Sequence, residues 1–297
     1  MPTLAVCAIT RNAALTLPIA LTSVRSVADQ IIVVDSGSTD NTVAIAQSFG
    51  AKVIGHPWQQ NYALQRNQYL GAVACDWVLV LDSDEFLDRQ AVSWLQNLKS
   101  RAFTPSTDHY WVPRRWVPPF CLTHYLTNSS HYPDWQLRLF RANSDCRYTG
   151  AVHEQLGGFA TAGERLSPFG LYHLNLYITD ETARREKVRC YGALGTAQDG
   201  AEYLYLPKLA DLELTPLHWG ILDSTVQPLL LSLPVPGSLP AGATVAIAPV
   251  LTDVAHLQSQ IQHYRDRLHW MEGSKFWQLR RLWQWARRSQ GDGFSHE

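Results

Sequence analysis

Acidic side chains stand directly after two short apolar segments of the sequence. Residues 31–34 run into Asp35, and residues 77–81 run into a D-S-D-E sequence that begins at Asp82. In extended backbone, side chains two residues apart point to the same side, so the carboxylates of Asp82 and Asp84 can share one ligand. Such a pair can hold a hard divalent cation whose remaining positions are filled by water and substrate phosphates. An isolated D-x-D is more often a solvated loop, and its place after an apolar segment is what favours a metal site here.

The segments that carry these acids belong to an alternating pattern of short apolar runs and helical periodicities. The expected strands are 4–10, 31–35, 52–55 and 77–81, and the expected helices are 16–27, 40–49 and 62–74. Strands that are apolar on both faces and alternate with helices are typical of an α/β fold with a mostly parallel sheet. Ligands of such sheets bind outside the carboxyl ends of the strands. The sequence therefore predicts a ligand site where Asp35 and Asp82 lie.

The turn after Asp35 has the sequence D-S-G-S-T-D and ends at Asp40. Asp40 can cap the helix that follows, which would be a purely structural role. Asp35 differs, because it lies where the base or ribose of a nucleotide could donate a hydrogen bond to a carboxylate. A dinucleotide is not expected, since the chain holds no G-x-G-x-x-G sequence.

The second half of the chain has a different texture. Aromatic residues, proline and histidine crowd the region after residue 108, and strand-like pieces at 109–113 and 136–140 predict an antiparallel extension of the sheet. Residues 180–194 are again helical in pattern. The expected organisation is a domain at 1–200, a Pro/Gly-rich linker or loosely folded segment at 201–251, and a helical tail at 252–297.

The composition excludes several classes of protein. Hydrophobic residues make up 46% of the 297 residues, which excludes wholesale disorder. The 25 basic and 26 acidic residues give a formal charge of -1, so nucleic acid is not an expected partner. No apolar run approaches the ~18 residues of a membrane span, and the start lacks a basic leader, so we expect a cytoplasmic protein. Five scattered cysteines fit reduced thiols in that compartment.

Several motifs stand in an order that resembles a known family. They are V-V-D-S-G-S-T-D-N-T at 33–42, Q-R-N at 65–67 and D-W-V-L-V-L-D-S-D-E at 76–85. With them, the first 87 residues resemble the nucleotide-binding half of a family 2 inverting glycosyltransferase of the GT-A fold, which is a Rossmann-like α/β fold. The sequences Y-P-D-W-Q-L-R-L-F-R at 132–141 and V-H-E at 152–154 are similar to the subgroup that includes lipopolysaccharide-core glucosyltransferases.

The resemblance implies transfer of a hexose from a UDP-sugar to a glycan or lipid-linked acceptor, as in the synthesis of cell-envelope polysaccharides. Asp35 would contact the uridine part of the donor, with Thr10 and Arg66 nearby. Asp84, with Asp82 beside it, would bind Mn²⁺ or Mg²⁺ at the diphosphate, which also places Asp82 at the nucleotide-sugar. The chain departs from the family pattern directly after the first of these acids, where a second acid often follows and serine stands here.

Glycosyl transfer also needs a base that takes the proton of the acceptor, and positive charge that stabilises the leaving diphosphate. Asp134 is the first candidate for the base, because it lies in the segment similar to the acceptor region of the subgroup, and Glu154 is the second. Arg138, Arg141 and His153 are candidates for contacting the diphosphate, and each could equally be an ordinary salt-bridge or core partner.

Two other functions are consistent with the D-x-D sequence. A phosphatase of the haloacid dehalogenase type also carries D-x-D after a strand, although there the motif usually follows the first strand, and here it follows a later one. A catalytically inactive protein that binds nucleotide-sugars is the other alternative. The joint presence of four acids in family positions argues against it: Asp35, Asp82, Asp84 and Asp134.

The tail carries a basic and aromatic segment. Residues 275–288 hold five basic residues and no acidic one, interleaved with tryptophan and leucine. Such a helix could lie on anionic lipid, which would place the protein peripherally on the inner face of the plasma membrane. Its apolar residues are spread around the helical wheel, so packing on the domain or on another subunit is the competing expectation.

Overall fold

The computed structural model describes most of the first 234 residues. The described residues are 1–100, 105, 107–119, 121–143, 145–167, 169–193, 202, 204–207, 212–217 and 219–234. All of them belong to one compact unit, Met1–Ile247. The second unit, Ala248–Glu297, lies outside the described residues, and so does the expected tail at 252–297.

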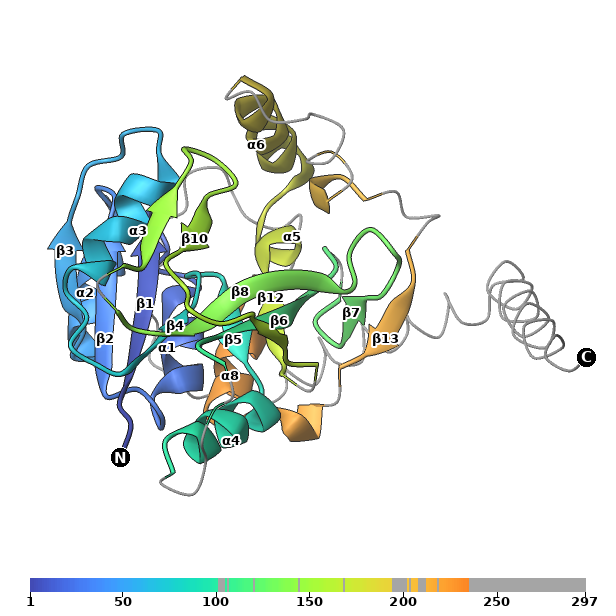
Figure 1. Ribbon diagram of the computed structural model, residues 1–297. Coiled ribbons are helices and arrows are strands. Elements are labelled where there is room, and N and C mark those ends of the chain that lie inside the picture. The colour runs from blue at the N-terminus through green and yellow to red at the C-terminus, as the bar shows by residue number, and fades with distance from the viewer. Residues whose placement is uncertain are drawn as a thin grey trace, which may run out of the picture. The chain divides into compact units, whose positions relative to one another are not determined.

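A large mixed sheet forms the centre of the first unit (Figure 1). Its strands are β1 (Leu4–Thr10), β2 (Gln30–Asp35), β3 (Lys52–Gly55), β4 (Trp77–Val80), β5 (Glu85–Leu87), β6 (His109–Trp116), β8 (Asp134–Arg141), β11 (Glu164–Arg165) and β12 (Leu171–His173). Within the described residues these nine strands follow the order β3-β2-β1-β4-β8-β6-β12-β5, with β11 beside β6. Two small sheets pair β9 (Arg147–Thr149) with β10 (Gln155–Gly157), and β7 (His124–Leu126) with β13 (Leu214–Pro216).

The first half of the sheet is parallel and the later half mixed. Strand β1 pairs in parallel with β2 and β4, and β2 pairs in parallel with β3. Strand β8 then joins antiparallel to β4, and β6 antiparallel to β8. The expectation of a mostly parallel α/β sheet with an antiparallel extension is thereby confirmed.

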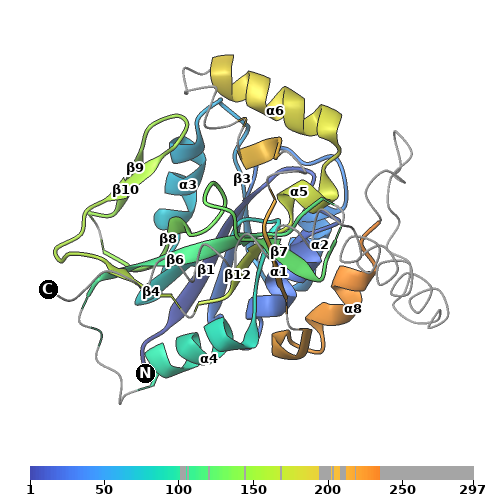
Figure 2. The same cartoon turned by 90° about the vertical axis from the view of Figure 1, so that its right-hand side faces the viewer.

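Helices cover both faces of the sheet. They are α1 (Leu17–Val24), α2 (Thr42–Ser48), α3 (Tyr62–Leu70), α4 (Arg89–Leu98), α5 (Asn175–Ile178), α6 (Glu181–Ala193) and α8 (Val226–Leu231), with a 3₁₀ turn, η2, at Trp219–Ile221. Buried residues of α1 and α2 pack together with β1 and β2 on one face, and buried residues of α3 pack on the other. Both views place α6 at one end of the unit and α4 at the opposite end (Figures 1 and 2).

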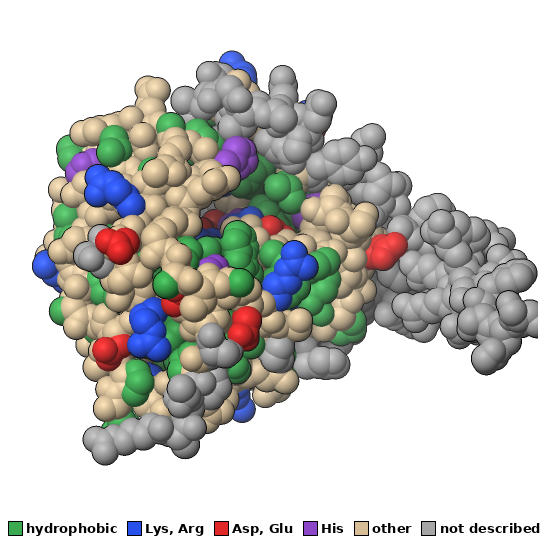
Figure 3. Space-filling view, in the orientation of Figure 1, with side chains coloured by type: hydrophobic (Ala, Val, Ile, Leu, Met, Phe, Trp, Pro, Cys, Tyr) green, Lys and Arg blue, Asp and Glu red, His purple; other side chains and the backbone are tan. Residues whose placement is uncertain are grey.

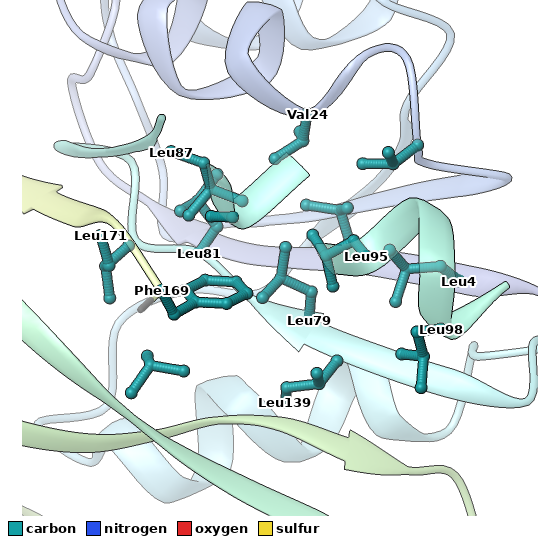
Figure 4. Packing of buried hydrophobic residues seen from close by; sticks show 14 of the residues in the cluster. Leu4, Val24, Leu79, Leu81, Leu87, Leu95, Leu98, Leu139, Phe169 and Leu171 are labelled. Atoms are coloured by element: carbon teal, nitrogen blue, oxygen red, sulfur yellow. The ribbon is translucent and has the colours of Figure 1, made fainter. Parts of the chain in front are cut away.

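Alternation along the central strands explains this layering. Val6 and Leu79 enter one core cluster, while their neighbours Cys7 and Val80 enter another on the opposite face. Figure 4 shows leucines from β1, β4, β8 and α4 packed together in the first cluster, which also contains Phe169. Each such side chain contributes about 1.5–3 kcal/mol when fully buried, so a slip of one residue in register would be strongly unfavourable.

Two regions differ from the sequence-based expectation. Helix α4 was not among the expected elements, yet it is well formed, and Asp88 accepts a hydrogen bond from the backbone N–H of Ala91 at its start. The stretch 201–251, expected as a linker or loosely folded segment, is packed in its described residues. Val226 and Leu230 are 0% and 1% exposed, because their apolar side chains fill a cluster built on Ile19, Phe86 and other residues of the sheet domain.

No helix in the described part of the chain combines the length and the apolar character that a membrane crossing requires.

Candidate active site

Three strand ends meet at the carboxyl edge of the parallel strands. Thr10 pairs in register with Asp35 at the ends of β1 and β2, and just past β4 the N–H of Leu81 donates to the carbonyl of Cys7 at 3.0 Å. Because β1 separates β2 from β4, Asp35 and Asp82 lie about 10 Å apart across the sheet, or two strand spacings. Figure 3 shows a hollow between β10 and α5 with acidic and basic side chains on its floor.

Asp35 holds the turn that follows β2. Its Oδ2 accepts from the backbone N–H groups of Gly37 and Ser38 at 3.0 and 2.9 Å, and its Oδ1 accepts from the hydroxyls of Ser38 and Thr10 at 2.5 and 3.3 Å. Gly37 has φ +93°, a left-handed conformation that favours glycine. The Asp35 carboxylate thus fixes the conformation of the turn that follows β2.

Seven charged side chains alternate in sign along one line of contacts, which we name the ion-pair chain. In order they are Glu154, Arg66, Asp82, Arg138, Glu85, Arg114 and Asp134, with successive N···O distances of 2.6, 2.9, 2.6, 2.6, 3.5 and 2.8 Å. Four carboxylates and three guanidinium groups leave the chain with one net negative charge. Glu85, the fifth member, is 0% exposed. The loop that carries Glu154 and strand β8, which carries Asp134, are thus joined through buried charge.

Two carboxylates of the ion-pair chain, those of Asp82 and Asp134, are kept charged by their arginine neighbours. Burial alone would raise the pKa of Asp82, but the positive charges of Arg138 and Arg66 outweigh burial and hold that pKa well below its ordinary value. Burial would raise the pKa of Asp134 as well, and the neighbouring Arg114 guanidinium lowers it below its usual range. Both carboxylates are therefore ionised at neutral pH. Neither has the raised pKa that would make it a stronger proton acceptor.

Asp84 is held by a different set of groups. Its Oδ2 lies 3.2 Å from Nε2 of His173 and accepts from Nδ2 of Asn175 at 3.1 Å. Burial would raise the pKa of Asp84, and the nearby His173 lowers it well below the ordinary value. The His173 ring is 4% exposed, and its Nδ1 is a buried atom without a hydrogen-bond partner among the described residues.

These donors fit a magnesium or manganese ion held by few protein ligands. No group of three or more His, Cys, Asp or Glu suited to a metal occurs among the described residues. Mg²⁺ is usually bound through one or two carboxylates together with waters and substrate phosphates, and ligands at about 2.1 Å and right angles lie about 3 Å apart. The 3.2 Å between Asp84 Oδ2 and His173 Nε2 matches that spacing. Both oxygens of Asp82 are instead taken by Arg66 and Arg138.

The two candidate bases have different surroundings. Asp134 Oδ2 accepts from Nε of Arg114 and Nε1 of Trp116, both at 2.8 Å, and Oδ1 accepts from Nε2 of Gln136 at 2.6 Å. Glu154 accepts from Arg66 through Oε1 at 2.6 Å, and in the described residues its Oε2 accepts no hydrogen bond. Glu154 therefore keeps one carboxylate oxygen available for a substrate proton.

Helix α3 sets the loop that carries Glu154. The Asn67 side chain brackets the backbone of Tyr148, donating to its carbonyl and accepting from its N–H, each at 2.9 Å. The N–H of Tyr62 donates to the carbonyl of Ala151 at 2.8 Å. The loop thus leaves β9 at a fixed place against α3, the helix that also carries the arginine bonded to Glu154.

Two of the residues expected at the diphosphate, Arg141 and His153, do not join the ion-pair chain. Arg141 pairs in register with Trp77 at the start of β4, and its guanidinium lies 5.0 Å from the Trp77 ring centroid, at the end of the strand away from the acids. His153 is exposed, next to Glu154, with φ +52°.

The structure also assigns contacts to residues that sequence reasoning passed over. Glu85 and Arg114 link the two halves of the ion-pair chain, and His173 lies against Asp84. Glu85 had a local signal, because it follows the D-x-D directly and precedes two apolar residues. Arg114 and His173 had none, since their partners are distant in sequence.

The family described as glycosyl transferase family 2 matches residues 5–160, which is more than half of the chain. The chain therefore belongs to glycosyl transferase family 2, and its α/β architecture is the GT-A fold expected from the resemblance.

Curated relatives match parts of the chain. A TPR repeat-containing protein of Synechococcus elongatus is 34% identical over 169 residues, which are 57% of this chain and 39% of that protein. An uncharacterized glycosyltransferase of Rickettsia felis is 45% identical over 82 residues, 28% of this chain and 29% of that protein. A lipopolysaccharide core biosynthesis glycosyltransferase, LpsC, of Rhizobium meliloti is 29% identical over 53% of this chain and 58% of that protein. The matches to the first two span well under half of those relatives.

Solved structures with similar features include S. aureus TarS and a synthase of Mycobacterium tuberculosis. The crystal structure of TarS residues 1–349 has a TM-score of 0.40, 14% identity and 78% coverage of both chains. Glucosyl-3-phosphoglycerate synthase, in complex with Mg²⁺ and uridine diphosphate, has a TM-score of 0.32 and 25% identity over 39% of this chain and 44% of the other.

Proposed function

We propose that this domain transfers a hexose from a UDP-sugar, with inversion, to a hydroxyl group of a glycan or lipid-linked acceptor. The observation that carries the proposal is the placement of Asp35 and the Asp82/Asp84 pair on either side of β1 at one sheet edge. A nucleotide-sugar lying across the end of β1 would have its uridine at the turn that Asp35 holds and its diphosphate near Asp84. Membership of glycosyl transferase family 2 supports this class of reaction.

The uridine end of the donor would meet the turn after β2. In this proposal Asp35 and Thr10 fix the turn that receives the base and ribose, and Gln65 supports it from behind by donating to the Ser36 hydroxyl at 2.6 Å. Arg66 stands between this turn and the diphosphate, bonded to Asp82 at 2.9 Å. Because these groups already have partners, the donor would bind a surface that is formed before it arrives, which lowers the entropic cost of binding.

Asp84 and His173 are the residues that would hold Mg²⁺ or Mn²⁺. The ion would supply Lewis-acid stabilisation of charge on the diphosphate oxygens. Asp84 remains ionised at neutral pH because its pKa is lowered, so its carboxylate is ready to bind a cation.

We assign the base to Glu154 in the first place and to Asp134 in the second, which reverses the order expected from the sequence. A base needs a lone pair that is not already engaged, and Glu154 Oε2 meets that condition in the described residues. Asp134 accepts three hydrogen bonds, and its lowered pKa makes it a weaker proton acceptor. In this scheme Asp134 fixes Arg114 and Trp116 on the acceptor side.

A thermal-shift screen of nucleotide sugars with and without Mn²⁺ tests the function. A ligand that binds only the folded state raises the melting temperature, and we expect a UDP-sugar with Mn²⁺ to do so more than UDP-sugar alone. Release of UDP on incubation with that donor would then be measured. Binding without any UDP release, also with glycan acceptors, would support the inactive nucleotide-sugar-binding alternative, and stabilisation by none of the UDP-sugars would contradict the proposal.

The phosphatase alternative is less compatible with the site. A D-x-D phosphatase uses the first aspartate as nucleophile, and here that residue, Asp82, has Oδ1 bonded to Arg66 and Oδ2 bonded to Arg138. Hydrolysis of a phosphate monoester by the wild-type chain, in the same buffer, is the measurement that would bring this alternative back.

A further inference from the structure

Departure of UDP places negative charge on the β-phosphate oxygen, and the ion-pair chain already carries one more negative than positive charge. Arg138 is 5% exposed and gives Nη2 to both Asp82 and Glu85. Arg66 is 6% exposed and is shared between Asp82 and Glu154. Since carboxylates outnumber guanidinium groups along this chain, its net charge would repel a diphosphate unless a further cation stands nearby.

Lys187 supplies a cation at this place from another element. It lies on α6, and its half-buried side chain interacts electrostatically with the carboxylate of Asp84 and with Tyr62, the first residue of α3. Its Nζ lies 4.4 Å from the ring centroid of Tyr205. Tyr205 packs against Trp116, whose ring centroid lies 4.4 Å from that of His173. Since His173 lies against Asp84, these rings place the Lys187 ammonium on the Asp84 side of the site, where the diphosphate of the donor is proposed to lie.

The inner face of α6 is fixed against the domain. Arg184, one turn before Lys187, donates through Nη1 to the carbonyls of Leu176 at 2.9 Å and Thr179 at 2.5 Å. Val188, next to Lys187, is 5% exposed. Residues three and four apart lie on one face of a helix, so Lys187 shares the face of Arg184 and Val188. Because that face packs on the domain, the lysine side chain lies toward the site and not toward solvent.

The ring beneath Lys187 belongs to the acceptor side of the site. Tyr205 packs edge-on against Trp116, with ring centroids 5.6 Å apart, and Trp116 donates from Nε1 to Asp134 at 2.8 Å. A lysine side chain is ordinarily protonated at neutral pH, so Lys187 brings a positive charge to this side of the site. A lysine ammonium is a compact charge with three donors, which suits a non-bridging phosphate oxygen.

We propose that Lys187 is a catalytic residue that contacts the diphosphate of the nucleotide-sugar beside Asp84 and stabilises the charge on the departing UDP. The assignment rests on the proposed glycosyl transfer. In that step the bond between the anomeric carbon and the β-phosphate oxygen breaks, and its electron pair goes to that oxygen. The acceptor oxygen forms the new bond to the anomeric carbon, and its proton passes to the carboxylate base. Lys187 keeps its own proton and donates hydrogen bonds to the phosphate.

The test compares Lys187→Met, Lys187→Arg and a control on the outer face of the same helix. Arg185→Met is the control, because Arg185 is exposed and, among the described residues, its ion pair is with Glu181 on that outer face. Binding of UDP and of uridine is measured by calorimetry with Mn²⁺ present, and kcat is measured with UDP-glucose. We expect Lys187→Met to weaken UDP binding about 10-fold or more and to lower kcat about 10²-fold, while uridine binding stays unchanged.

Each outcome separates this assignment from the proposed function. Lys187→Arg retains the charge and is expected to bind UDP within about 3-fold of the wild-type affinity. If the methionine variant does not fold, this arginine variant still tests whether the positive charge supports UDP binding. Wild-type UDP affinity and kcat in Lys187→Met would overturn the role of Lys187 while leaving the glycosyltransferase proposal intact. Equal loss of uridine and UDP binding would reduce Lys187 to a structural residue. A wild-type chain that binds no uridine nucleotide would overturn both.

Discussion

Asp82 and Glu85 share a single guanidinium nitrogen: Nη2 of Arg138 lies 2.6 Å from Asp82 Oδ2 and 2.6 Å from Glu85 Oε1. The backbone N–H of Asp82 also donates to Oε2 of Glu85 at 3.0 Å. The D-x-D turn is therefore closed by a wholly buried acid three residues along, and Glu85 determines where the Asp82 carboxylate can lie. Glu85 acts through its partners and is a positioning residue.

Replacing Glu85 by glutamine should destabilise the fold and disorder the site together. The variant removes the carboxylate charge that faces the guanidinium groups of Arg138 and Arg114. Removing one partner of a buried ion pair costs about 3–5 kcal/mol of unfolding free energy. Urea unfolding measures this loss, with Glu186→Gln as the control, because Glu186 pairs with Arg189 at the exposed face of α6. An unchanged unfolding midpoint in Glu85→Gln would contradict the central place of this side chain.

The choice between Glu154 and Asp134 can be decided by kinetics. If Glu154 is the base, Glu154→Gln should lower kcat by about 10²–10⁴-fold with little change in KM for the donor, since a general base acts in the transition state. Asp134→Asn should then affect the acceptor KM more than kcat, because Asp134 holds Arg114 and Trp116. The opposite pattern, with the large kcat loss in Asp134→Asn, would restore the order expected from the sequence.

Removal of Asp84 should abolish the response to divalent cations. In Asp84→Asn the carboxylate charge is lost while the size is kept, and we expect the extra thermal stabilisation by Mn²⁺ with UDP to disappear. Electron paramagnetic resonance of Mn²⁺ in the presence of UDP measures binding without reference to activity. His173→Gln is expected to weaken Mn²⁺ binding to a smaller extent, by about 10- to 100-fold if the ring is a ligand. Full Mn²⁺ binding by Asp84→Asn would place the ion elsewhere.

Asn67 and Asn61 form a matched pair on helix α3. Asn61 accepts from the N–H of Leu64 at 3.0 Å as the N-terminal cap, whereas Asn67 brackets the backbone of Tyr148. Alanine at either position should cost about 1–2 kcal/mol of unfolding free energy. Only Asn67→Ala should also lower kcat, because it releases the strand that leads to Glu154. Equal kcat in the two variants would mean that the bracket is structural alone.

The tail beyond the described residues offers a separate test of membrane contact. Replacing the five basic residues of 275–288 by glutamine should weaken co-sedimentation with vesicles that contain anionic phosphatidylserine, since each such charge contributes about 1 kcal/mol near an anionic surface. Vesicles of neutral phosphatidylcholine serve as the control. Unchanged binding to anionic vesicles would remove the lipid role, and a change in oligomeric state would favour packing on another subunit.

The sequence by itself determined the first four strands and the edge at which Asp35 and Asp82 lie. Each of these strands is a short apolar run that ends in a polar turn, so the information is local, and parallel packing brings the ends to one edge. The sequence also indicated the segment with Asp134 and the V-H-E segment with Glu154. It did not identify α4, although the buried Ala91, Leu95 and Leu98 have the spacing of one helix face.

Only the tertiary structure decided how the charges pair. Arg66 meets Glu154 across 88 positions of sequence, and Asp84 meets Asn175 across 91. These partners depend on how the loop after β9 lies against α3 and on the register of β12 against β5, which pairs His173 with Glu85. Burial of apolar side chains such as Phe86 and Tyr172 sets that register. A carboxylate's partner, and with it the pKa and the free lone pairs that make it a ligand or a base, is a property of this packing and not of the local motif.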